Sequence, residues 1–441
     1  MIRVRFAPSP TGYLHVGNAR IALANVLFAR HHGGHVLLRL DDTDAARSRP
    51  EFAAAIPQDL AWLGIGWDAT FRQSDRLAAY AAAADRLRAA GRLYPCFESE
   101  EELAAKREAR LRRRLPPVYD RAMLRLTPEQ RAAAEANGKR PHWRFRLSDG
   151  ETNWRDLVLG QRAVKLPTVS DPVLVRADGT PLYTFTSVVD DLAEGISHVI
   201  RGEDHVTNTA IQRDLMAALG ANPGAIAFAH LPLLTDADGG KLSKRLGGLT
   251  LRALRADGIE AGAVTGYLAR LGTSADPEPA SLETLAATFD LGLFSRSAAR
   301  FDGRQLLALN RRVLHATPFA AVSARLPAGA TEAFWNAVRG NLDLLTEARG
   351  WWDVVAGDII PPPSEADPAF FAAARTTLPP EPWDEATWSA WTAALAAASG
   401  RKGRALFHPL RLALTGEEQG PELRALLPLM GRARVARRLG A

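Results

Sequence analysis

Apolar and polar residues follow first a strand-like and then a helix-like period at the start of the chain. Residues 2–6 alternate apolar and basic side chains, which is typical of a strand, and apolar positions recur at helical spacing over 18–31. Residues 33–44 show a turn, a buried strand and an acidic loop. Because a strand, a helix and a strand in this order form a βαβ unit, the pattern predicts a parallel sheet, with further helices over 51–63 and 74–90.

The pattern changes near residue 95. A highly charged segment, ESEEELAAKREARLRRR (98–114), predicts a helix, and short strands with polar turns are expected over 152–164 and 171–191. Within the second stretch, Asp178 and Gly179 are a hairpin signal. A sheet-like pattern resumes at 196–205, so we interpret 96–185 as an insertion within the sheet domain.

Helical patterns joined by short loops follow from residue 245 to the end of the sequence. The predicted fold class is therefore α/β, with a Rossmann-type parallel-sheet domain, an inserted α+β domain and an all-helical C-terminal region. The expected domain bounds are 1–95 and 186–319 for the two halves of the sheet domain, 96–185 for the insertion and 320–441 for the helical region.

Composition narrows the class of protein. A length of 441 residues is enough for about three domains. Cys96 is the single cysteine, which excludes an internal disulfide and a zinc site made of four cysteines. With no apolar leader and no apolar run of membrane length, we expect a cytoplasmic protein. The net charge of +6 permits a polyanionic partner without demonstrating one.

The first predicted strand is followed by a loop, FAPSPTGYLHVGNAR, rich in turn-forming residues. Pro8 stiffens the exit from the strand and Gly12 allows a tight turn. His15 and Asn18 fall at the N-terminus of the next helix, where free N–H groups favour phosphate, and Gly17 would let a flat ligand approach the backbone. The alternative is a Pro/Gly-rich loop with a capping asparagine.

A second candidate stretch is GGKLSKR at 239–245. Lys241, Lys244 and Arg245 place three cations close together beside Ser243, a hydrogen-bond donor. Cations on a flexible loop can close over a triphosphate and stabilise charge that develops in a transition state. The alternative is a solvated basic loop.

Taken together, these motifs resemble those of the glutamyl-tRNA synthetase family, within class I aminoacyl-tRNA synthetases. The motifs occur in order, and the resemblance is dense over about residues 1–315 and weaker beyond. They are FAPSPTGYLHVGNAR, LRLDDTD (38–44), YTFTSVVDD (183–191), HVIRGEDHVTNTA (198–210), AHLPLL (229–234) and LSKR (242–245).

The resemblance implies an ATP site. His15 and Asn18 would contact the phosphates, while Lys244, with Lys241, would stabilise the pyrophosphate as glutamate attacks the α-phosphate. The other ATP-binding positions that it implies are Pro8, Gly12, Gly17, Leu234, Ser243 and Arg245. Mg²⁺ is expected on the phosphates.

The resemblance also implies a glutamate pocket, in which Arg5 would bind the side-chain carboxylate in bidentate fashion. Asp41 would accept from the α-amino group, although many relatives have glutamate there, and relatives often have asparagine where this chain has Ser187. The pocket residues carried over are Arg5, Ala7, Ser9, Asp41, Tyr183, Ser187, Arg201 and Asp204.

Structural roles stay open for several of these residues. Asp41 could cap the following turn, Tyr183 could be a core aromatic with a satisfied hydroxyl, and Arg201 could simply pair with Asp204. Zinc, which some relatives bind in the insertion, is not expected because Cys96 has no partner cysteines.

The expected partners are L-glutamate, ATP and tRNA(Glu), with tRNA(Gln) left open, and a monomer is the family default. The resemblance implies that the insertion grips the tRNA acceptor end and that the C-terminal region reads the anticodon, with no anticodon contacts assigned. Residues 106–114 would contact phosphates, and the alternative is a solvated helix face. The tryptophans of the C-terminal region are expected in a helical core, and 432–438 on a solvated helix face. The alternatives are glutamylation of a modified anticodon base, a tRNA-binding protein with a dead ATP site, and a small-molecule adenylating ligase.

Overall fold

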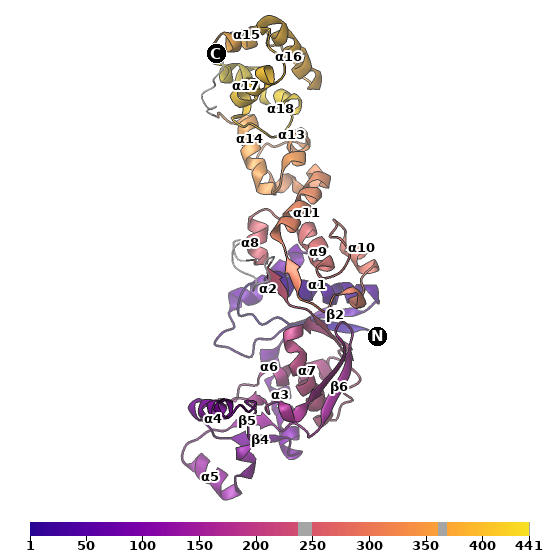
Figure 1. The fold of residues 1–441 in the computed structure, drawn as a ribbon, viewed down its shortest axis with the longest axis vertical. Coiled ribbons are helices and arrows are strands. Elements are labelled where there is room, and N and C mark those ends of the chain that lie inside the picture. The colour runs from indigo at the N-terminus through magenta and orange to yellow at the C-terminus, as the bar shows by residue number, and fades with distance from the viewer. Residues whose placement is uncertain (237–248, 360–367, 441) are drawn as a thin grey trace. The chain divides into compact units, whose positions relative to one another are not determined.

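The computed structural model describes residues 1–236, 249–359 and 368–440. The chain forms two compact units (Figure 1). The first unit contains Met1–Leu254 and Thr265–Asp302, and the second contains Arg255–Val264 and Gly303–Ala441. Each unit has its own core and is described on its own.

The predicted βαβ unit is confirmed at the start of the first unit. Strand β1 (Arg3–Phe6) lies parallel to β2 (His35–Leu40), and β2 lies parallel to β3 (Ala69–Arg72). Helix α1 (Val16–His31) connects the first two strands and buries most of its length. It is hydrophobic nearly all round because it is covered by the sheet and by α10 (Leu282–Ala287).

A second sheet continues this one across the unit. Its order is β7–β6–β10–β9, with β9 (His198–Gly202) and β10 (Ala227–Leu231) parallel. Next to β9, the Ser197 amide donates to the Arg3 carbonyl at 2.9 Å, which brings β9 alongside β1. The carboxyl ends of β1, β9 and β10 therefore share one edge, where ligands of parallel sheets bind.

The stretch predicted as an insertion contains strands that belong to two different sheets. The hairpin of β6 (Glu151–Asp156) and β7 (Gly160–Lys165) joins β10 in the sheet described above. The separate antiparallel sheet consists of β4 (Leu93–Cys96), β5 (His142–Phe145) and β8 (Val173–Val175). The domain bounds at 96 and 185 stay predictions, and the hairpin ties the middle of this stretch to the main sheet.

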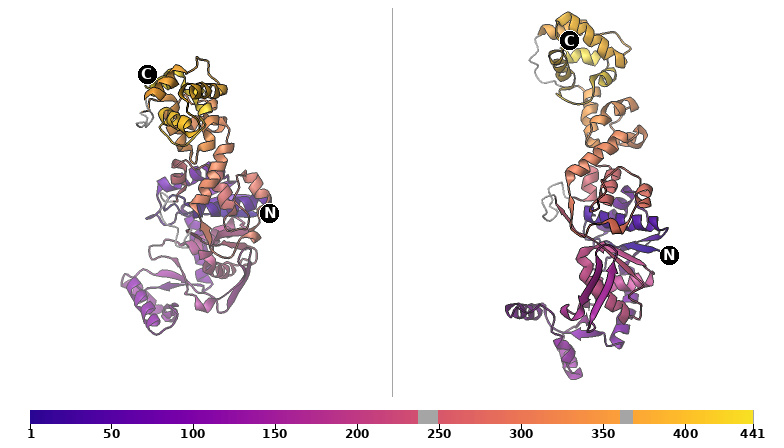
Figure 2. Two further views of the ribbon diagram at one scale, coloured as in Figure 1. Left: turned by 45° about the horizontal axis from the view of Figure 1, so that its top comes forward. Right: turned by 45° about the vertical axis from the view of Figure 1, so that its right-hand side comes forward.

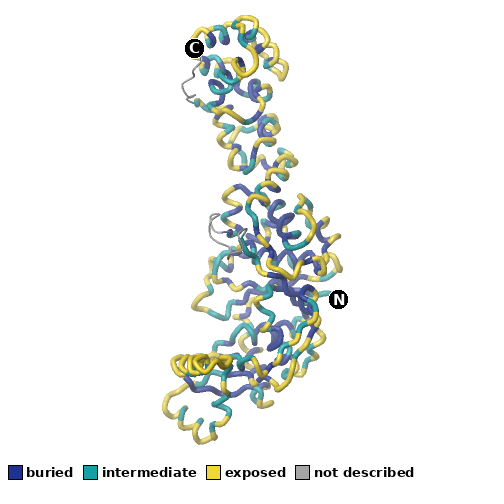
Figure 3. Tube along the Cα trace, viewed as in Figure 1, coloured by how far each residue is buried: buried dark blue, intermediate teal, exposed yellow. Residues whose placement is uncertain are grey.

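Two helices stand beyond the antiparallel sheet, at the end of the unit away from α1 (Figures 1 and 2). They are α4 (Glu100–Arg112) and α5 (Pro128–Ala136), and neither buries a single residue. Figure 3 shows α4 mostly exposed, and the face with Leu103, Lys106 and Arg110 is half-buried. Both begin with a complete capping box, at Ser99 and at Thr127. The capping hydrogen bonds stabilise these helices, which gain little from tertiary packing because they bury no residue.

The prediction of strands over 171–191 was wrong in its second half. A turn at Asp178–Gly179 is present, but Tyr183–Ala193 forms helix α6. The β-branched residues in YTFTSVVDDLA favour a strand, yet its apolar residues also fall on one helical face, which packs on α7 (Val206–Ala218). Tertiary packing therefore decides the local structure here.

Helices dominate after residue 245, but one short strand, β12 (Ala299–Phe301), pairs in parallel with β11 (Leu234–Asp236). The remaining helices are α2 (Pro50–Trp62), α3 (Leu77–Ala89), α8 (Leu251–Ala256), α9 (Ala261–Arg270), α11 (Gly303–Ala316), α12 (Phe319–Val322), α13 (Glu332–Val338), α14 (Ala348–Ala356), α15 (Pro368–Thr376), α16 (Glu385–Ser399), α17 (Arg404–Thr415), α18 (Leu423–Met430) and α19 (Arg432–Arg438).

The second unit has one helical core, and the tryptophans lie in or against it as predicted. Trp335 and Trp391 are fully buried, and the Trp391 indole donates to the Ala374 carbonyl at 3.0 Å. Those packed against the core are Trp351, Trp352, Trp383 and Trp388. Core packing explains these side chains without a nucleic-acid contact.

Replacement of Trp391 by alanine should destabilise the second unit by about 3–5 kcal/mol, because it leaves a large cavity and removes the indole hydrogen bond to the Ala374 carbonyl. Urea unfolding followed by circular dichroism measures the change. Phe407→Ala is the matched control, since Phe407 is 44% exposed and its loss should cost below about 1 kcal/mol. An equal loss of unfolding free energy in the two variants would contradict the prediction that Trp391 is a main element of this core.

Candidate functional site

A cavity of about 660 Å³ opens at the shared carboxyl edge of β1, β9 and β10. Its wall is built by the loop after β1, the first turn of α1, the start of α6, and the segments that follow β9 and β10. This volume suits a small-molecule substrate. All of its lining residues belong to the first unit.

Most residues predicted for the ATP and glutamate sites line this cavity. They are Arg5, Ala7, Pro8, Ser9, Gly12, His15, Gly17, Asn18, Tyr183, Arg201, Asp204 and Leu234. Asp41 and Ser187 do not line it. The predicted loop residues Lys241, Ser243, Lys244 and Arg245 lie outside the residues that the structure describes.

His15 is the N-cap of α1. Its Nδ1 accepts from the Gly17 amide at 3.0 Å and more weakly from the Asn18 amide, while the Asn18 side chain accepts from the His15 amide at 3.2 Å. Because Nδ1 accepts, a neutral ring carries its proton on Nε2. Burial lowers the pKa of His15, so the ring is neutral at pH 7 and has one N–H to offer a ligand.

This geometry contains the structural alternative considered for the loop and leaves Nε2 of the His15 ring unused by the cap. Asn18 completes a capping box, as in the structural alternative, and the same box sets the orientation of the His15 ring. The second residue of the helix must be small here. A Cβ at Gly17 would lie 2.8 Å from Cε1 of the His15 ring, which is closer than real Cβ contacts.

Arg5 lies on β1 and is only 3% exposed, yet it lines the cavity. Its Nε donates to Oδ1 of Asp191 on α6 at 3.0 Å. Its terminal nitrogens have no hydrogen-bond partner within the described residues, so they are available to a ligand. Such a pair of parallel N–H groups fits a carboxylate.

Asp41 faces Arg39 instead of the cavity. Arg39 Nε and Nη2 donate to the two carboxylate oxygens of Asp41 at 2.6 and 3.2 Å, and Arg39 Nη1 donates to Asp191 at 2.8 Å. Burial opposes the charge of Arg39, but the carboxylates of Asp41 and Asp191 outweigh it and raise its pKa well above the ordinary value. The capping role considered for Asp41 is therefore replaced by a buried ion pair.

Arg201 on β9 is held by four groups. Its Nε donates to His230 Nε2 at 3.2 Å, Nη1 donates to the Tyr183 hydroxyl at 3.1 Å, and Nη2 donates to Thr209 and to the His205 carbonyl. No ion pair joins it to Asp204 among the described contacts, so the mutual pairing considered for these two residues is absent. Tyr183 does have a satisfied hydroxyl.

A buried carboxylate sets the tautomer of His230. Asp156 at the end of β6 accepts from His230 Nδ1 at 2.5 Å, and both side chains are fully buried. His230 Nε2 is then left with a lone pair for the Arg201 N–H. The β6–β7 hairpin, predicted to belong to the insertion, therefore supports a cavity residue through one imidazole.

Ser187 lies behind the cavity wall. It is completely buried, its hydroxyl donates to the Tyr183 carbonyl at 2.6 Å, and it accepts from the Gln212 amide at 2.8 Å. Its contacts support the turn of α6 that presents Tyr183.

The electrostatic character of the cavity is positive. Arg5, Arg20 and Arg201 line it, whereas Asp204 is the one carboxylate among its described lining residues. Burial and the nearby Arg201 charge lower the pKa of His205 to about 4, so this ring is neutral at pH 7. The site is therefore suited to anionic ligands such as phosphates and carboxylates.

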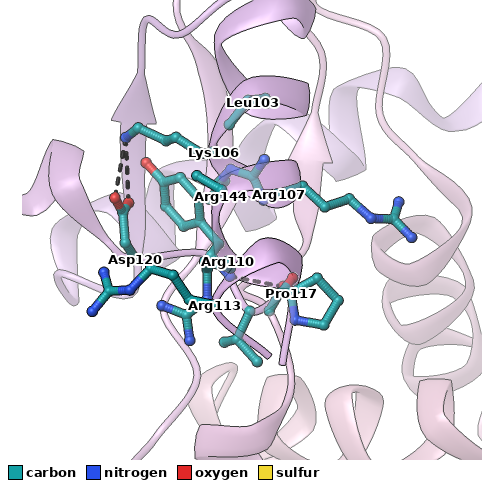
Figure 4. A pocket seen from close by; sticks show the side chains of 12 residues that line it. Leu103, Lys106, Arg107, Arg110, Arg113, Pro117, Asp120 and Arg144 are labelled. Atoms are coloured by element: carbon teal, nitrogen blue, oxygen red, sulfur yellow. Dashed lines mark hydrogen bonds and ion pairs between the residues drawn. The ribbon is translucent and has the colours of Figure 1, made fainter. Parts of the chain in front are cut away.

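A second cavity, of about 610 Å³, lies beside α4 (Figure 4). Lys106 on its wall is paired with Glu98 and Asp120, and Arg110 Nε donates to the Pro116 carbonyl at 2.7 Å. Arg107 and Arg113 make no ion pair within the described part of the chain. Two guanidinium groups are thus free at this surface.

Cys96 is buried, and its Sγ lies 3.7 Å from the hydroxyl of Tyr119, which lines this second cavity. Burial raises the pKa of its thiol to about 11. Across residues 1–236, 249–359 and 368–440, no group of three or more histidine, cysteine or acidic side chains is placed to hold a metal. In the same ranges, no helix is both long and apolar enough to span a bilayer.

Sequence reasoning missed the residues that hold the cavity residues in place. Arg39, Asp191 and His230 lie in the quoted motifs and Asp156 lies in the strand region expected over 152–164, but no role was assigned to them. The sequence feature that could have identified them is a charged residue or a histidine within a strongly apolar strand, such as Arg39 in HVLLRL. Such a side chain needs a buried partner, although the sequence does not identify it.

Comparisons with known proteins agree with this site. The family "tRNA synthetases class I (E and Q), catalytic domain" matches residues 1–308, and "Anticodon binding domain" matches residues 364–441. Similarity therefore continues beyond residue 315, where the sequence motifs alone indicated a weaker resemblance.

Relatives match the chain over its whole length. A glutamate–tRNA ligase 2 of Acidiphilium cryptum is 67% identical over 439 residues, covering 100% of this chain and 99% of the relative. Another, of Granulibacter bethesdensis, is also 67% identical and is covered to 98%. The match includes the C-terminal region, which does not favour a truncated enzyme that modifies an anticodon base.

Solved structures are similar as well. A glutamate tRNA ligase of Elizabethkingia meningosepticum, crystallised with its amino acid, superposes with a TM-score of 0.86 at 26% identity, covering 99% of this chain and 98% of that one. A glutamate–tRNA synthetase of Elizabethkingia anophelis gives 0.87 at 27% identity, with the same coverage. By its full-length similarity and its site, the chain belongs to the glutamate–tRNA ligases, a family of class I aminoacyl-tRNA synthetases.

Proposed function

We propose that this chain ligates L-glutamate to tRNA(Glu) in two steps in the cavity of the first unit. An oxygen of the glutamate α-carboxylate attacks the α-phosphorus of ATP, and the bond to the leaving pyrophosphate breaks. The terminal ribose hydroxyl of tRNA then attacks the acyl carbon, and AMP leaves. The observation that carries the proposal is a cationic cavity whose wall combines a helix N-terminus with a free arginine fork.

The nucleotide half of the site lies at the start of α1. The free N–H groups of the first turn and the helix dipole favour phosphate, and the Nε2–H of His15 adds a donor. Asn18 and Gly17 complete this wall, with Pro8, Gly12 and Leu234 around it. These groups need only bind and orient the phosphates, because in-line displacement depends mainly on positioning and charge stabilisation.

The remaining nucleotide contacts come from the predicted loop residues Lys241, Ser243, Lys244 and Arg245. Their role is carried by the family resemblance alone. Mg²⁺ would neutralise phosphate charge. Since Asp204 is the one acidic residue among the described residues of the cavity wall, we propose that the ion enters with ATP instead of occupying a protein site of its own.

The glutamate half lies at the opposite part of the wall. We assign the side-chain carboxylate to the free terminal nitrogens of Arg5, with Ala7 and Ser9 beside it. Arg201 and Tyr183 offer polar groups to the rest of the amino acid, and Asp204 is placed to accept from its ammonium group. For Asp41 and Ser187, the contacts favour support of this pocket over direct binding.

For tRNA, we propose that the stretch 96–185 contacts the acceptor end and that the helical C-terminal region contacts the anticodon. Free Arg107 and Arg113 at the second cavity support the first assignment, and the match to an anticodon-binding family supports the second. We also propose that the protein works as a monomer in the cytoplasm.

A charging assay tests the proposal directly. Radiolabelled glutamate, ATP and Mg²⁺ are incubated with tRNA(Glu) or tRNA(Gln) transcripts, with pyrophosphate exchange in the absence of tRNA as the control. We expect charging of tRNA(Glu), and charging of tRNA(Gln) would add a second acceptor. Exchange that needs no tRNA, with neither transcript charged, would contradict the proposal and favour a small-molecule adenylating ligase.

Gly17→Ala should lower the rate of glutamate activation by about tenfold or more, because the new Cβ displaces the His15 ring from its phosphate contact. The net stability of the helix should change by less than about 1 kcal/mol, since the higher helix propensity of alanine offsets the capping hydrogen bonds lost when the His15 ring moves. Pyrophosphate exchange with tRNA present measures the rate, and thermal unfolding measures the stability.

Gly66→Ala is the matched control for this substitution. Gly66 belongs to the same unit but does not line the cavity, and a Cβ there meets nothing within 4 Å, so the exchange rate of this variant should stay close to that of the unmodified chain. A Gly17→Ala variant as active as this control would remove His15 orientation from the mechanism.

Combined Arg107→Ala and Arg113→Ala should weaken tRNA binding and reduce the slope of log affinity against log salt by about one for each phosphate that the variant no longer neutralises. Filter binding over a salt series measures both the affinity and the slope. Arg112→Ala is the control on the same helix, because Arg112 is already paired with Glu108 at 2.7 Å. An unchanged slope in the double variant would show that α4 is a solvated surface.

A further inference from the structure

The buried carboxylate of Asp191 connects two arginines from neighbouring strands. Its Oδ1 accepts from Arg5 Nε at 3.0 Å and from Arg39 Nη1 at 2.8 Å. The side chains of Arg5 and Asp191 are each 4% exposed, and that of Arg39 is 1% exposed. Burial opposes ionisation of Asp191, but the charges of Arg5 and Arg39 outweigh it and hold its pKa below the ordinary value.

Arg39 is the fixed end of this arrangement. Its other two nitrogens are already bound to Asp41, so it cannot turn toward the cavity. Asp191 is therefore held from the β2 side and presents the same oxygen to Arg5 on β1. The side chain of Arg5 has one hydrogen-bond partner within the described residues, and that partner is Asp191.

A guanidinium is planar, so a contact at Nε sets the direction of the remaining nitrogens. With Nε used by Asp191, the two terminal nitrogens of Arg5 form the edge that faces the cavity. We propose that Asp191 is a positioning residue for substrate specificity, which aims this edge of Arg5 at the side-chain carboxylate of glutamate. The inference rests on the proposed role of Arg5 in the glutamate pocket.

The arrangement explains how the site would reject the amide. Overall positive charge in the cavity attracts anions, but it does not by itself distinguish a carboxylate from an amide at one position. The Arg5 edge offers only N–H donors. An amide nitrogen placed there would meet donor against donor, and it would leave buried groups unpaired.

Asp191→Asn in the full chain tests the inference. It keeps the shape of the side chain but replaces a charge-assisted contact with a weaker neutral one, so the KM for glutamate should rise by about tenfold. The KM for ATP should stay within about twofold, because the phosphate wall is untouched. The preference for glutamate over glutamine, measured by competition in the exchange assay with tRNA present, should fall.

Asp190→Asn is the matched control. Asp190 is also buried and is adjacent in sequence, but it accepts from Gln73 at 2.7 Å and from Tyr80 at 2.9 Å. It pairs with Arg76 at 3.2 Å and lies 3.9 Å from Arg39 Nε, so it shares the buried charges around Arg39 without contacting Arg5. A merely structural role predicts the same kinetic changes for both variants. Identical glutamate KM values for the two variants, or a lower KM in Asp191→Asn, would overturn the inference.

Arg5→Lys separates this inference from the proposed function. It should raise the glutamate KM by itself, and Asp191→Asn should then add little in that background, because the two residues act as one unit. An unchanged KM in Arg5→Lys would instead contradict the proposed pocket. Should Asp191→Asn not yield folded protein, Asp191→Glu keeps the charge and shifts the carboxylate by one methylene, and the same rise in KM is expected.

Discussion

Burial of Arg5, Arg39 and Asp41 at the first two strands, together with Asp191 of α6, is the constraint on which the cavity depends. A buried guanidinium is tolerated only when carboxylates pair with it. Asp191 pairs with both arginines through one oxygen and leaves one edge of Arg5 without a partner among the described residues. These buried charges therefore leave the terminal nitrogens of Arg5 available at the cavity.

A similar arrangement occurs on the other side of the cavity, where Asp156 and His230 support Arg201. In both places a buried carboxylate supports an arginine that lines the cavity. Asp191 contacts Arg5 directly, and Asp156 supports Arg201 through His230. The two supports come from distant parts of the chain, α6 and β6, and both reach the cavity because the two sheets lie edge to edge. The cavity is therefore a property of the assembled first unit and not of any single motif.

Much of this architecture could be predicted from the sequence. The βαβ unit and the helical C-terminal core follow from hydrophobic periodicity, and the capping loop before α1 follows from its turn residues. Helix α6 was missed because its β-branched residues favour a strand until packing is known. The parallel contact of β6 with β10 was missed because parallel pairing joins residues far apart along the chain, as Phe228 and Asp156 do. For the site, most of the motif residues that the structure describes line the cavity, but Asp41 and Ser187 do not, because the partner of a buried group is set by tertiary contacts.

The capping role of His15 has a consequence for how this chain can change over time. One imidazole begins helix α1 through its Nδ1 and is placed to meet a phosphate through its Nε2. Asparagine or serine would serve as well for the helix, yet neither extends as far toward the ligand. The cap uses Nδ1 and the proposed phosphate contact uses Nε2 of the same ring. A substitution at position 15 could therefore keep the helix cap and still remove the chemistry.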